Sequence, residues 1–214
     1  MKTAIVLSGG GARGAFQAGV LEWLRVVGVK IDFISGVSIG ALNGAFLAFG
    51  SGDVLQEVWF NEAKGFTLTP GRKLERIMRY HLEFRKQQIP FNFGIVSMSN
   101  GEYVNLDAGN VQDFEALISG LTASCSIPGI FPAVPEVKLK NGSSIRLAMD
   151  GGLRNVSPLR SAYEWAATQK ESVRIIAIST RTDQMPQRYS RNRLVLAGRA
   201  LQVLMSEVQE GDMQ

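Results

Sequence analysis

The stretch Gly36-Val37-Ser38-Ile39-Gly40 predicts a sharp strand-to-helix turn, and the rest of the predicted fold extends from it. The apolar run 33–35 precedes it, and an Ala-, Leu- and Gly-rich segment, 39–50, follows as an expected buried helix. A serine with glycines two positions away on either side matches the nucleophile-elbow pattern G-x-S-x-G. Glycine at these positions removes the Cβ atoms that would collide where strand and helix meet. The stretch alone fits equally well a glycine-rich turn in which Ser38 caps the helix.

Strand and helix patterns alternate on both sides of this turn. Residues 3–8 form a nearly continuous apolar run typical of a buried strand, and 15–28 carry apolar residues close to helical spacing. A second strand, 31–35, leads into the turn. This β-α-β-α order predicts an α/β fold with three layers, α/β/α, around a mostly parallel central sheet.

The remaining elements are predicted by the same patterns. We expect helices at 54–60, 72–84, 111–121, 161–170 and 191–209, hairpins at 93–104 and 137–149, and a strand at 173–180. Asn-Gly pairs at 100–101 and 141–142 mark the two hairpin turns. Neither a repeat nor a shift in composition divides the 214 residues, so we expect a single domain over 1–214.

The composition is that of a globular protein, with 45% hydrophobic and 20% charged residues. The net charge of +4 fits ordinary solvated charge, and we expect no nucleic-acid partner. The single cysteine, Cys125, excludes an internal disulfide and a cysteine-based metal cluster, and we expect neither a metal nor a cofactor. The apolar start, 1–7, is too short for a signal peptide, and 39–50 is shorter than the ~20 residues that span a bilayer. We therefore expect a cytoplasmic or peripheral membrane protein; the sequence does not indicate its oligomeric state.

A second glycine-rich turn, Gly9-Gly10-Gly11-Ala12-Arg13-Gly14, joins the first predicted strand to the first helix. It fits the dinucleotide fingerprint G-x-G-x-x-G, but the acidic residue that this fingerprint needs is matched only by Asp32, at the start of the second strand instead of its end. Consecutive glycine N–H groups at a helix N-terminus can also stabilise negative charge on a carbonyl oxygen. Because Ser38 follows one β-α unit later, we favour an oxyanion hole, with nucleotide binding as the alternative.

A serine nucleophile needs a base, and two residues are candidates. The only histidine, His81, lies in a basic predicted helix, and the resulting order Ser-His-Asp differs from that of α/β-hydrolases, so we favour a surface or structural role for it. Asp150 follows the apolar run 147–149 and precedes Gly151 and Gly152, which permit close approach of the backbone. An aspartate of ordinary pKa, about 3.9, is a weak base, so burial must raise the pKa of Asp150 if it is to serve. The Asp-Gly-Gly motif taken alone fits a simple turn.

These three motifs, in this order, resemble the signatures of the patatin-like phospholipases. The run from Ala123-Ser124 to Pro128, then Phe131-Pro132, and Pro158 also resemble that family, and the similarity covers residues 3 to about 180. The resemblance implies hydrolysis of lipid acyl esters by a Ser–Asp dyad without histidine. Ser38 would be the nucleophile and Asp150 the general base, with no cofactor.

The resemblance also implies how the substrate is held. The oxyanion hole would be formed by the loop residues Gly9, Gly10, Gly11, Ala12, Arg13 and Gly14, with Arg13 helping to fix the loop. The substrate would be a phospholipid or lysophospholipid at a membrane surface. Three apolar residues, Phe46, Ile130 and Phe131, are candidates for an acyl pocket, although core packing is favoured for each.

Two departures from the family pattern stand out. Family members usually run longer, so the helix that ends at Gln214 is a candidate truncation. An asparagine that often precedes the segment equivalent to Pro158 is matched only by Asn155, slightly displaced, with Val156 after it. A lipid-binding protein that keeps the motifs without turnover is therefore a further alternative.

Overall fold

The computed structural model describes residues 1–62 and 70–180. The strands are β1 (Lys2–Leu7), β2 (Phe33–Val37), β3 (Phe91–Ser97), β4 (Tyr103–Asp107), β5 (Val134–Lys138), β6 (Ser144–Asp150) and β7 (Val173–Ile178). The α-helices are α1 (Gly14–Val26), α2 (Ile39–Ala48), α3 (Leu55–Glu57), α4 (Pro70–Leu82), α5 (Phe114–Ser124) and α6 (Leu159–Ala167). The shorter turns are η1 (Gly11–Arg13), η2 (Gly52–Val54), η3 (Val58–Glu62, a π-helix), η4 (Ala108–Asn110) and η5 (Gly151–Leu153). The helix expected at 191–209 lies outside the described residues.

All seven strands belong to one sheet, in the order β5-β6-β3-β2-β1-β7, with β4 paired to β3. The neighbours β7, β1, β2 and β3 run parallel, whereas the two predicted hairpins add β4, β5 and β6 as antiparallel strands. The predicted α/β fold with a parallel core is therefore confirmed. The antiparallel strands follow from the hairpin turns, because two strands joined by a tight turn must run in opposite directions.

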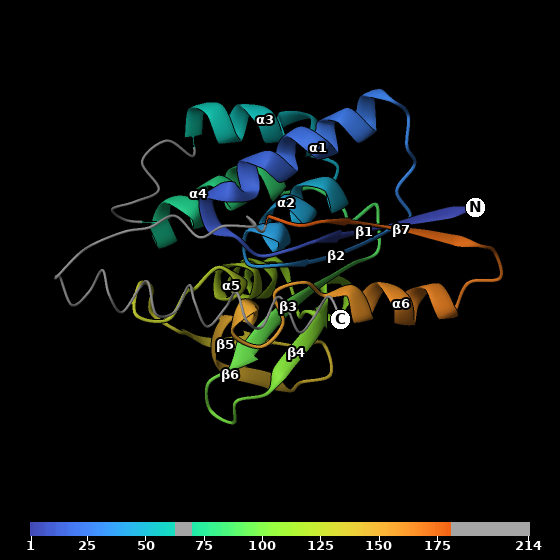
Figure 1. Cartoon of the computed structure of the whole chain (residues 1–214). Coiled ribbons are helices and arrows are strands. Elements are labelled where there is room, and N and C mark those ends of the chain that lie inside the picture. The colour runs from blue at the N-terminus through green and yellow to red at the C-terminus, as the bar shows by residue number, and fades with distance from the viewer. Residues whose placement is uncertain (63–69, 181–214) are drawn as a thin grey trace, which may run out of the picture.

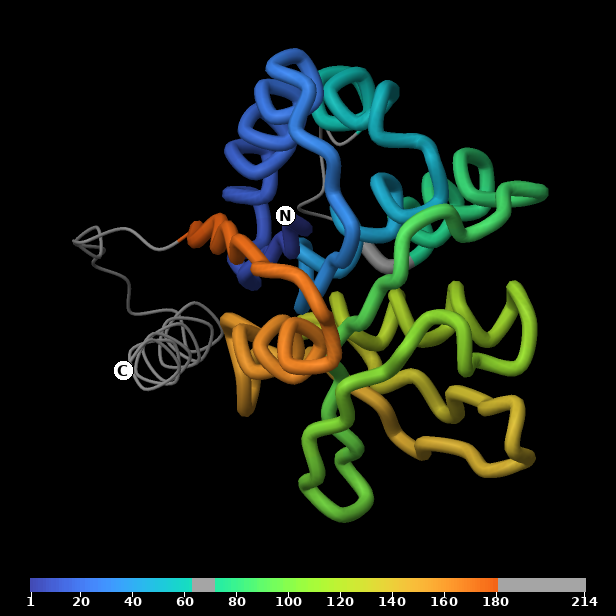
Figure 2. Tube along the Cα trace, turned by 90° about the vertical axis from the view of Figure 1, so that its right-hand side faces the viewer, coloured from blue at the N-terminus to red at the C-terminus, as the bar shows by residue number. Residues whose placement is uncertain are grey.

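Helices cover both faces of the sheet, as Figure 1 shows. Side chains of β1 alternate between these faces: Ala4 and Val6 pack toward α6, whereas Ile5 and Leu7 belong to the main core under α1 and α2. Figure 2, turned by 90°, shows α1 above β1 and α6 below it. Because both faces are buried, the strand is apolar along most of its length. This is the three-layer arrangement expected from the sequence.

The register brings distant motifs to one edge of the sheet. Val37, at the end of β2, pairs with Gly94 in the middle of β3, and the next residue of β3, Ile95, pairs with Asp150 on antiparallel β6. Residues after β1 and β2 therefore lie beside the end of β6. In Figure 1 this edge is on the left, opposite the amino terminus.

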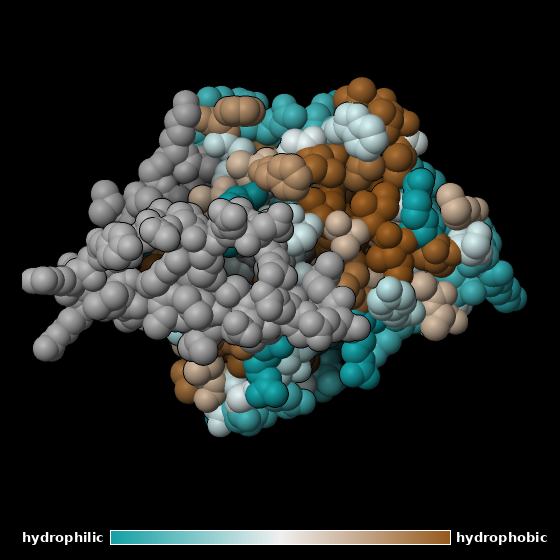
Figure 3. Space-filling view, viewed as in Figure 1, coloured by the Kyte–Doolittle hydropathy of each residue, from teal (hydrophilic) through white to brown (hydrophobic). Residues whose placement is uncertain are grey.

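An apolar surface patch lies far from this edge of the sheet. Figure 3 shows hydrophobic residues gathered around the end of α1, where Val26 and Val27 are exposed. This end of α1 lies away from the carboxyl ends of the parallel strands, so the apolar surface there is separate from the edge that joins the motifs. Within the described residues, every helix is too short or too polar to cross a lipid bilayer.

Candidate active site

The turn around Ser38 has the geometry of a strained nucleophile elbow. Ser38 has φ 55° and ψ −128°, and it is one of only three non-glycine residues with positive φ in the described chain. A Cβ on Gly36 would lie 2.5 Å from the carbonyl oxygen of Gly40, and a Cβ on Gly40 would overlap the carbonyl oxygen of Leu7. Both glycines are therefore needed for space, as the sequence predicts. A non-glycine residue held at such backbone angles raises the free energy of the folded state by about 1–3 kcal/mol, and strain of this kind is typical of active sites.

Ser38 and Asp150 are in direct contact. The Ser38 hydroxyl donates a hydrogen bond of 2.6 Å to Oδ2 of Asp150, and Oδ1 accepts the N–H of Gly152 at 2.8 Å. The serine is 4% exposed and the aspartate is fully buried. Burial raises the pKa of Asp150 to about 7, and the hydrogen bonds from Ser38 and Gly152 oppose that rise. A carboxylate of such pKa is a far better proton acceptor near neutrality than an ordinary aspartate.

The first glycine of the Asp-Gly-Gly motif, Gly151, is also needed because a side chain would not fit there. A Cβ on Gly151 would lie 2.5 Å from the carbonyl oxygen of Gly94, on β3. The backbone N–H of Asp150 donates to the carbonyl oxygen of Ser126 at 3.1 Å. The backbone of Asp150 is thus fixed by β3 on one side and by the loop after α5 on the other.

The glycine loop, residues 9–14, lies next to the elbow. A Cβ on Gly9 would be 3.3 Å from the Cβ of Ser38. The N–H of Gly9 donates to the carbonyl oxygen of Val156 at 2.9 Å, and both the N–H and the Nε of Arg13 donate to the carbonyl oxygen of Gly10 at 3.3 Å. Arg13 therefore braces the loop, and Val156 joins it to the segment after the Asp-Gly-Gly motif.

Three N–H groups of this loop are left for a ligand. Those of Gly10, Gly11 and Ala12 make no hydrogen bond to any part of the chain that the structure describes. Gly11 has φ +58°, and Ala12 belongs to the short helix η1 that leads into α1. Of the predicted oxyanion-hole residues, these three have the donors available, whereas the N–H groups of Gly9, Arg13 and Gly14 are already used within the protein.

The end of α5 and the loop after it contribute residues to which the sequence assigned no role. The N–H of Ser38 donates to the hydroxyl of Ser124 at 2.9 Å, and that hydroxyl donates to the carbonyl oxygen of Gly94 at 2.7 Å. The thiol of Cys125 donates to the carbonyl oxygen of Ser38 at 3.2 Å. Burial and the charge of Asp150 raise the pKa of this thiol well above its usual value, so it stays protonated. The available signal was the small-residue run Ala-Ser-Cys-Ser between an apolar helix and Pro128.

His81 occupies a different part of the molecule, which agrees with the structural role favoured for it. Its Nε2 lies 2.8 Å from Oε1 of Glu62, and its ring contacts those of Phe46 and Tyr80. Its side chain is only 12% exposed, so it is a packed residue of α4 and not a surface one. Ser38 has Asp150 as its hydrogen-bond acceptor and makes no contact of this kind with His81.

The acidic residue considered for nucleotide binding also lies elsewhere. Oδ2 of Asp32 accepts the N–H of Thr3 at 2.9 Å, and Oδ1 pairs with Lys30 at 3.2 Å. These contacts are at the amino ends of β1 and β2, whereas the glycine loop is at the carboxyl end of β1. Asp32 therefore does not complete a dinucleotide site with the loop.

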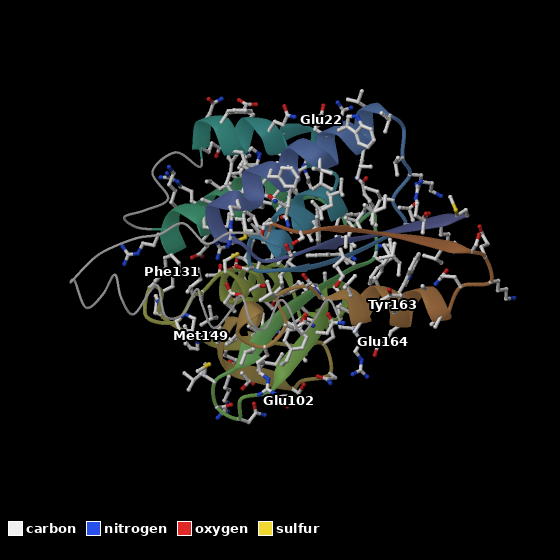
Figure 4. The ribbon with its side chains drawn as sticks, viewed as in Figure 1. Glu22, Glu102, Phe131, Met149, Tyr163 and Glu164 are labelled. Carbon is white, nitrogen blue, oxygen red and sulfur yellow. The ribbon has the colours of Figure 1, made fainter. Side chains whose placement is uncertain are left out.

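The three candidate acyl-pocket residues divide between core and surface. Phe46 is fully buried in the core of α2, whereas Ile130 is 57% exposed and Phe131 is partly exposed. Figure 4 labels Phe131 and, nearby in the same view, Met149 from β6. The N–H of Asp150 donates to the carbonyl oxygen of Ser126 and that of Phe131 to Ile127, so the segment containing Ile130 and Phe131 begins beside the site.

A buried Ser–Asp pair at a strained elbow, beside a loop of open N–H groups, defines a class of serine hydrolase site. The comparison with known families is consistent with this class, because residues 5–163 match the family described as patatin-like phospholipase. The chain belongs to this family. The family resemblance inferred from the three motifs is thereby confirmed.

Several relatives share part of this sequence. The neuropathy target esterase sws of Drosophila persimilis is 31% identical over 181 residues, which is 72% of this chain and 11% of the relative. The lysophospholipase nte1 of Aspergillus terreus is 34% identical over 132 residues, covering 62% of this chain and 8% of the relative. An uncharacterized NTE family protein of Mycobacterium tuberculosis is 31% identical over 169 residues, covering 72% and 27%. The chain therefore spans only about a tenth to a quarter of the length of these relatives.

Among solved structures, VipD from Legionella pneumophila is similar in fold. The TM-score is 0.50 at 13% sequence identity, and the match covers 82% of this chain and 49% of that chain. At this identity the similarity concerns the fold alone, and it agrees with the observed sheet and its flanking helices.

Proposed function

We propose that the protein is a serine lipid acyl hydrolase in which Ser38 is the nucleophile and Asp150 the general base. The observation that carries the proposal is the 2.6 Å hydrogen bond from the Ser38 hydroxyl to a fully buried carboxylate at a strained elbow. The family supports the reaction class, since its description is that of a phospholipase. The names of the relatives, an esterase and a lysophospholipase, support an ester of a fatty acid as the substrate.

The reaction begins with the transfer of a proton. The carboxylate of Asp150 takes the hydroxyl proton of Ser38 as the serine oxygen attacks the ester carbonyl carbon. The carbonyl oxygen becomes an oxyanion, which the N–H groups of residues 10–12 stabilise. The tetrahedral intermediate then collapses: the bond to the alcohol breaks, the protonated Asp150 gives its proton to the leaving alkoxide, and an acyl-enzyme remains.

The second half of the reaction repeats these roles with water. Asp150 removes a proton from a water molecule, whose oxygen attacks the acyl carbon, and the proton returns to Ser38 as the fatty acid leaves. Because the pKa of Asp150 is raised to about 7, the free enzyme gains its active, ionised base as the pH rises through that value. We therefore expect kcat/KM to rise with pH with a midpoint near 7, and to be low at pH 5.

The partner of the site is proposed to be a lipid surface. Met98, Ile130 and Leu147 are 47%, 57% and 49% exposed, and the N–H of Met98 donates to the carbonyl oxygen of Leu147 at 3.0 Å. They lie in the segments after β3, before β5 and within β6, on the side of the sheet where the carboxyl ends of the parallel strands are found. Arg146 is exposed on β6, and Arg154, exposed after η5, donates from Nη1 to the carbonyl oxygen of Gly101 in the segment after β3 at 3.2 Å. Apolar side chains with nearby cations suit the boundary between acyl chains and anionic headgroups, so we propose peripheral contact with a membrane from the cytoplasm.

Product analysis on mixed phospholipid and lysophospholipid vesicles tests the proposal. We expect the wild-type chain to release free fatty acids, the Ser38→Ala variant to release none, and the matched control Ser143→Ala, on the exposed β5–β6 turn, to match the wild type. Mass spectrometry of the products identifies which lipid is cleaved and at which ester. Fatty-acid release by Ser38→Ala at the wild-type rate would contradict the proposal. Vesicle binding by the wild type without any release would favour the alternative of a lipid-binding protein.

A further inference from the structure

A network of buried amides connects the glycine loop to the helix that carries the nucleophile. Gln17 on α1 and Asn43 on α2 are both fully buried. The Nδ2 of Asn43 donates to Oε1 of Gln17 at 3.0 Å, and the indole N–H of Trp59 donates to Oδ1 of Asn43 at 3.0 Å. Buried amides of this kind are costly unless they are hydrogen-bonded, so a fully bonded pair in the core requires a structural or functional reason.

The remaining donors of the pair hold the two ends of the glycine loop. The Nε2 of Gln17 donates to the carbonyl oxygen of Ser8 at 2.8 Å, directly before the loop, and to that of Ile178 on β7 at 3.2 Å. The Nδ2 of Asn43 donates to the carbonyl oxygen of Gly14 at 3.0 Å, which is the last residue of the loop. All four amide hydrogens of the two side chains are therefore used, and three of the four bonds go to backbone carbonyls that bracket or adjoin the loop.

The position of Asn43 relates this bracket to the reaction. It lies on α2, five residues after Ser38, so its place relative to the nucleophile is fixed by the helix. The loop is otherwise held by the segments that follow η5 and β7: the Gly9 N–H donates to Val156, and the Thr180 hydroxyl donates to the carbonyl oxygen of Gly9. Among these hydrogen bonds, only those of the amide pair connect the loop directly to α2, the helix that follows the nucleophile.

We propose that Gln17 and Asn43 are positioning residues that set the distance between the oxyanion donors, residues 10–12, and the Ser38 hydroxyl. The inference rests on the proposed function for its catalytic consequence. Neither side chain touches the substrate; each acts through the backbone of the loop. Oxyanion stabilisation depends strongly on donor placement, and misplacement by about 1 Å can lower a rate by about 100-fold.

The variants Gln17→Met and Asn43→Leu test this with a soluble p-nitrophenyl ester as the probe, which avoids any contribution from membrane binding. We expect kcat to fall about 10- to 100-fold, with KM changed less than about threefold and the midpoint of the pH profile unchanged, because the surroundings of Asp150 are intact. The double variant should be little worse than the more damaging single variant, since both act through one network. Trp59→Phe, which removes the indole donor to Asn43, provides a milder variant if the others fail to fold, and we expect a smaller loss of kcat.

Ser161→Ala is the matched control. Ser161, buried on α6, accepts the Nδ2 groups of Asn92 at 3.2 Å and Asn105 at 3.0 Å, so its removal also breaks hydrogen bonds to side-chain amides, in a part-buried network on the other face of the sheet. We expect a lower unfolding temperature for this control with wild-type kcat. An equal fall of kcat in the control, or wild-type kcat in Gln17→Met, would overturn the proposal.

Amide hydrogen exchange separates this inference from the proposed function. We expect faster exchange at residues 10–14 in Gln17→Met and Asn43→Leu than in the wild type and in Ser161→Ala. If the wild type hydrolyses no ester and Ser38 resists a fluorophosphonate, the proposed function fails, but the exchange rates still decide whether the amide pair holds the loop. Unchanged exchange at residues 10–14 would overturn the positioning role whatever the activity.

Discussion

The two glycine-rich turns of this chain follow neighbouring parallel strands, yet their glycines do different work. In the elbow, a Cβ at Gly36 or Gly40 would collide with backbone atoms, and the residue in the strained conformation is a serine. In the loop, a Cβ on Gly11 would meet nothing within 4 Å, and this glycine itself has the positive φ. The elbow is therefore limited by space, whereas this position of the loop is limited by backbone conformation.

The proposed base, Asp150, and the proposed oxyanion hole, residues 10–12, therefore have different surroundings. Ser38 is nearly buried and Asp150 fully buried, so the carboxyl group of the proposed base is desolvated and its pKa is raised. The loop keeps three N–H groups unbonded to the described chain, so it can offer them to an oxygen of a substrate. Substitutions on the buried side should accordingly have larger effects than those on the open side.

The largest expected effect on stability comes from removing the buried carboxylate with Asp150→Asn. The pKa of Asp150 is raised from 3.8 to about 7 in the folded protein, so the unfolded state loses its proton at a lower pH than the folded state does. Wild-type stability is therefore lost as the pH rises from about 4 to about 7, by roughly 4 kcal/mol at about 1.4 kcal/mol per pH unit. We expect the free energy of unfolding of Asp150→Asn to exceed that of the wild type at pH 8, and the advantage to shrink at pH 5.

Urea unfolding of both proteins at the two pH values measures this difference, and a control with Asp107→Asn, a capping carboxylate of η4, accounts for the substitution itself. If the free energy of unfolding of Asp150→Asn exceeded that of the wild type by the same amount at pH 5 and pH 8, burial would not destabilise the ionised carboxylate.

Gly40→Ala tests the claim that the elbow is limited by space. Its Cβ would overlap the carbonyl oxygen of Leu7, a backbone atom that cannot rotate away, so we expect a loss of about 3 kcal/mol or more. Circular dichroism during thermal unfolding is the measurement. Gly19→Ala, on the exposed side of α1 with open space at its Cβ, is the control and should not destabilise the protein. A Gly40→Ala protein as stable as the wild type would refute the steric account.

Ser124→Ala tests the support behind the elbow. It removes the acceptor of the Ser38 N–H and the donor to Gly94, so one buried N–H loses its partner. The expected cost is about 1–3 kcal/mol of stability, with a fall in kcat because the strained turn is less well fixed. Chemical denaturation together with ester hydrolysis measures both. A variant with wild-type stability and kcat would show that Ser124 does not support the elbow.

Gly11→Ala, in the glycine loop, is expected to have the smallest effect. Alanine at φ +58° costs roughly 1–2 kcal/mol in backbone conformation, without a collision. We expect a modest fall in unfolding temperature and retention of most hydrolysis, since the N–H groups of the loop remain. If Gly11→Ala were as damaging as Gly40→Ala, the distinction between the two turns would fail.

The sequence predicted the fold well because its signals are local. Apolar runs predicted the strands, and the Asn-Gly pairs 100–101 and 141–142 predicted both hairpins. The contact between Ser38 and Asp150 followed from motif order and strand ends. The contacts of Ser124, Gln17 and Asn43 could not be predicted, because the hydrogen-bond partners of these buried polar side chains are distant in the sequence.

The same limit explains the remaining differences. That the N–H of Gly9 is used by Val156 depends on a contact between segments 147 residues apart, which no local pattern encodes. His81 was expected at the surface or in a structural role, and its packing against Phe46 and its pairing with Glu62 come from tertiary structure alone. Residues that work through long-range hydrogen bonds are thus found only once the fold is known.

Labelling with a fluorophosphonate tests the central claim, a serine activated by Asp150 without histidine, most directly. Intact mass spectrometry after exposure to the reagent should show one adduct on the wild type and on His81→Ala, none on Ser38→Ala, and a strongly slowed reaction on Asp150→Asn. Loss of labelling in a folded His81→Ala variant, or labelling that persists in Ser38→Ala, would contradict this account.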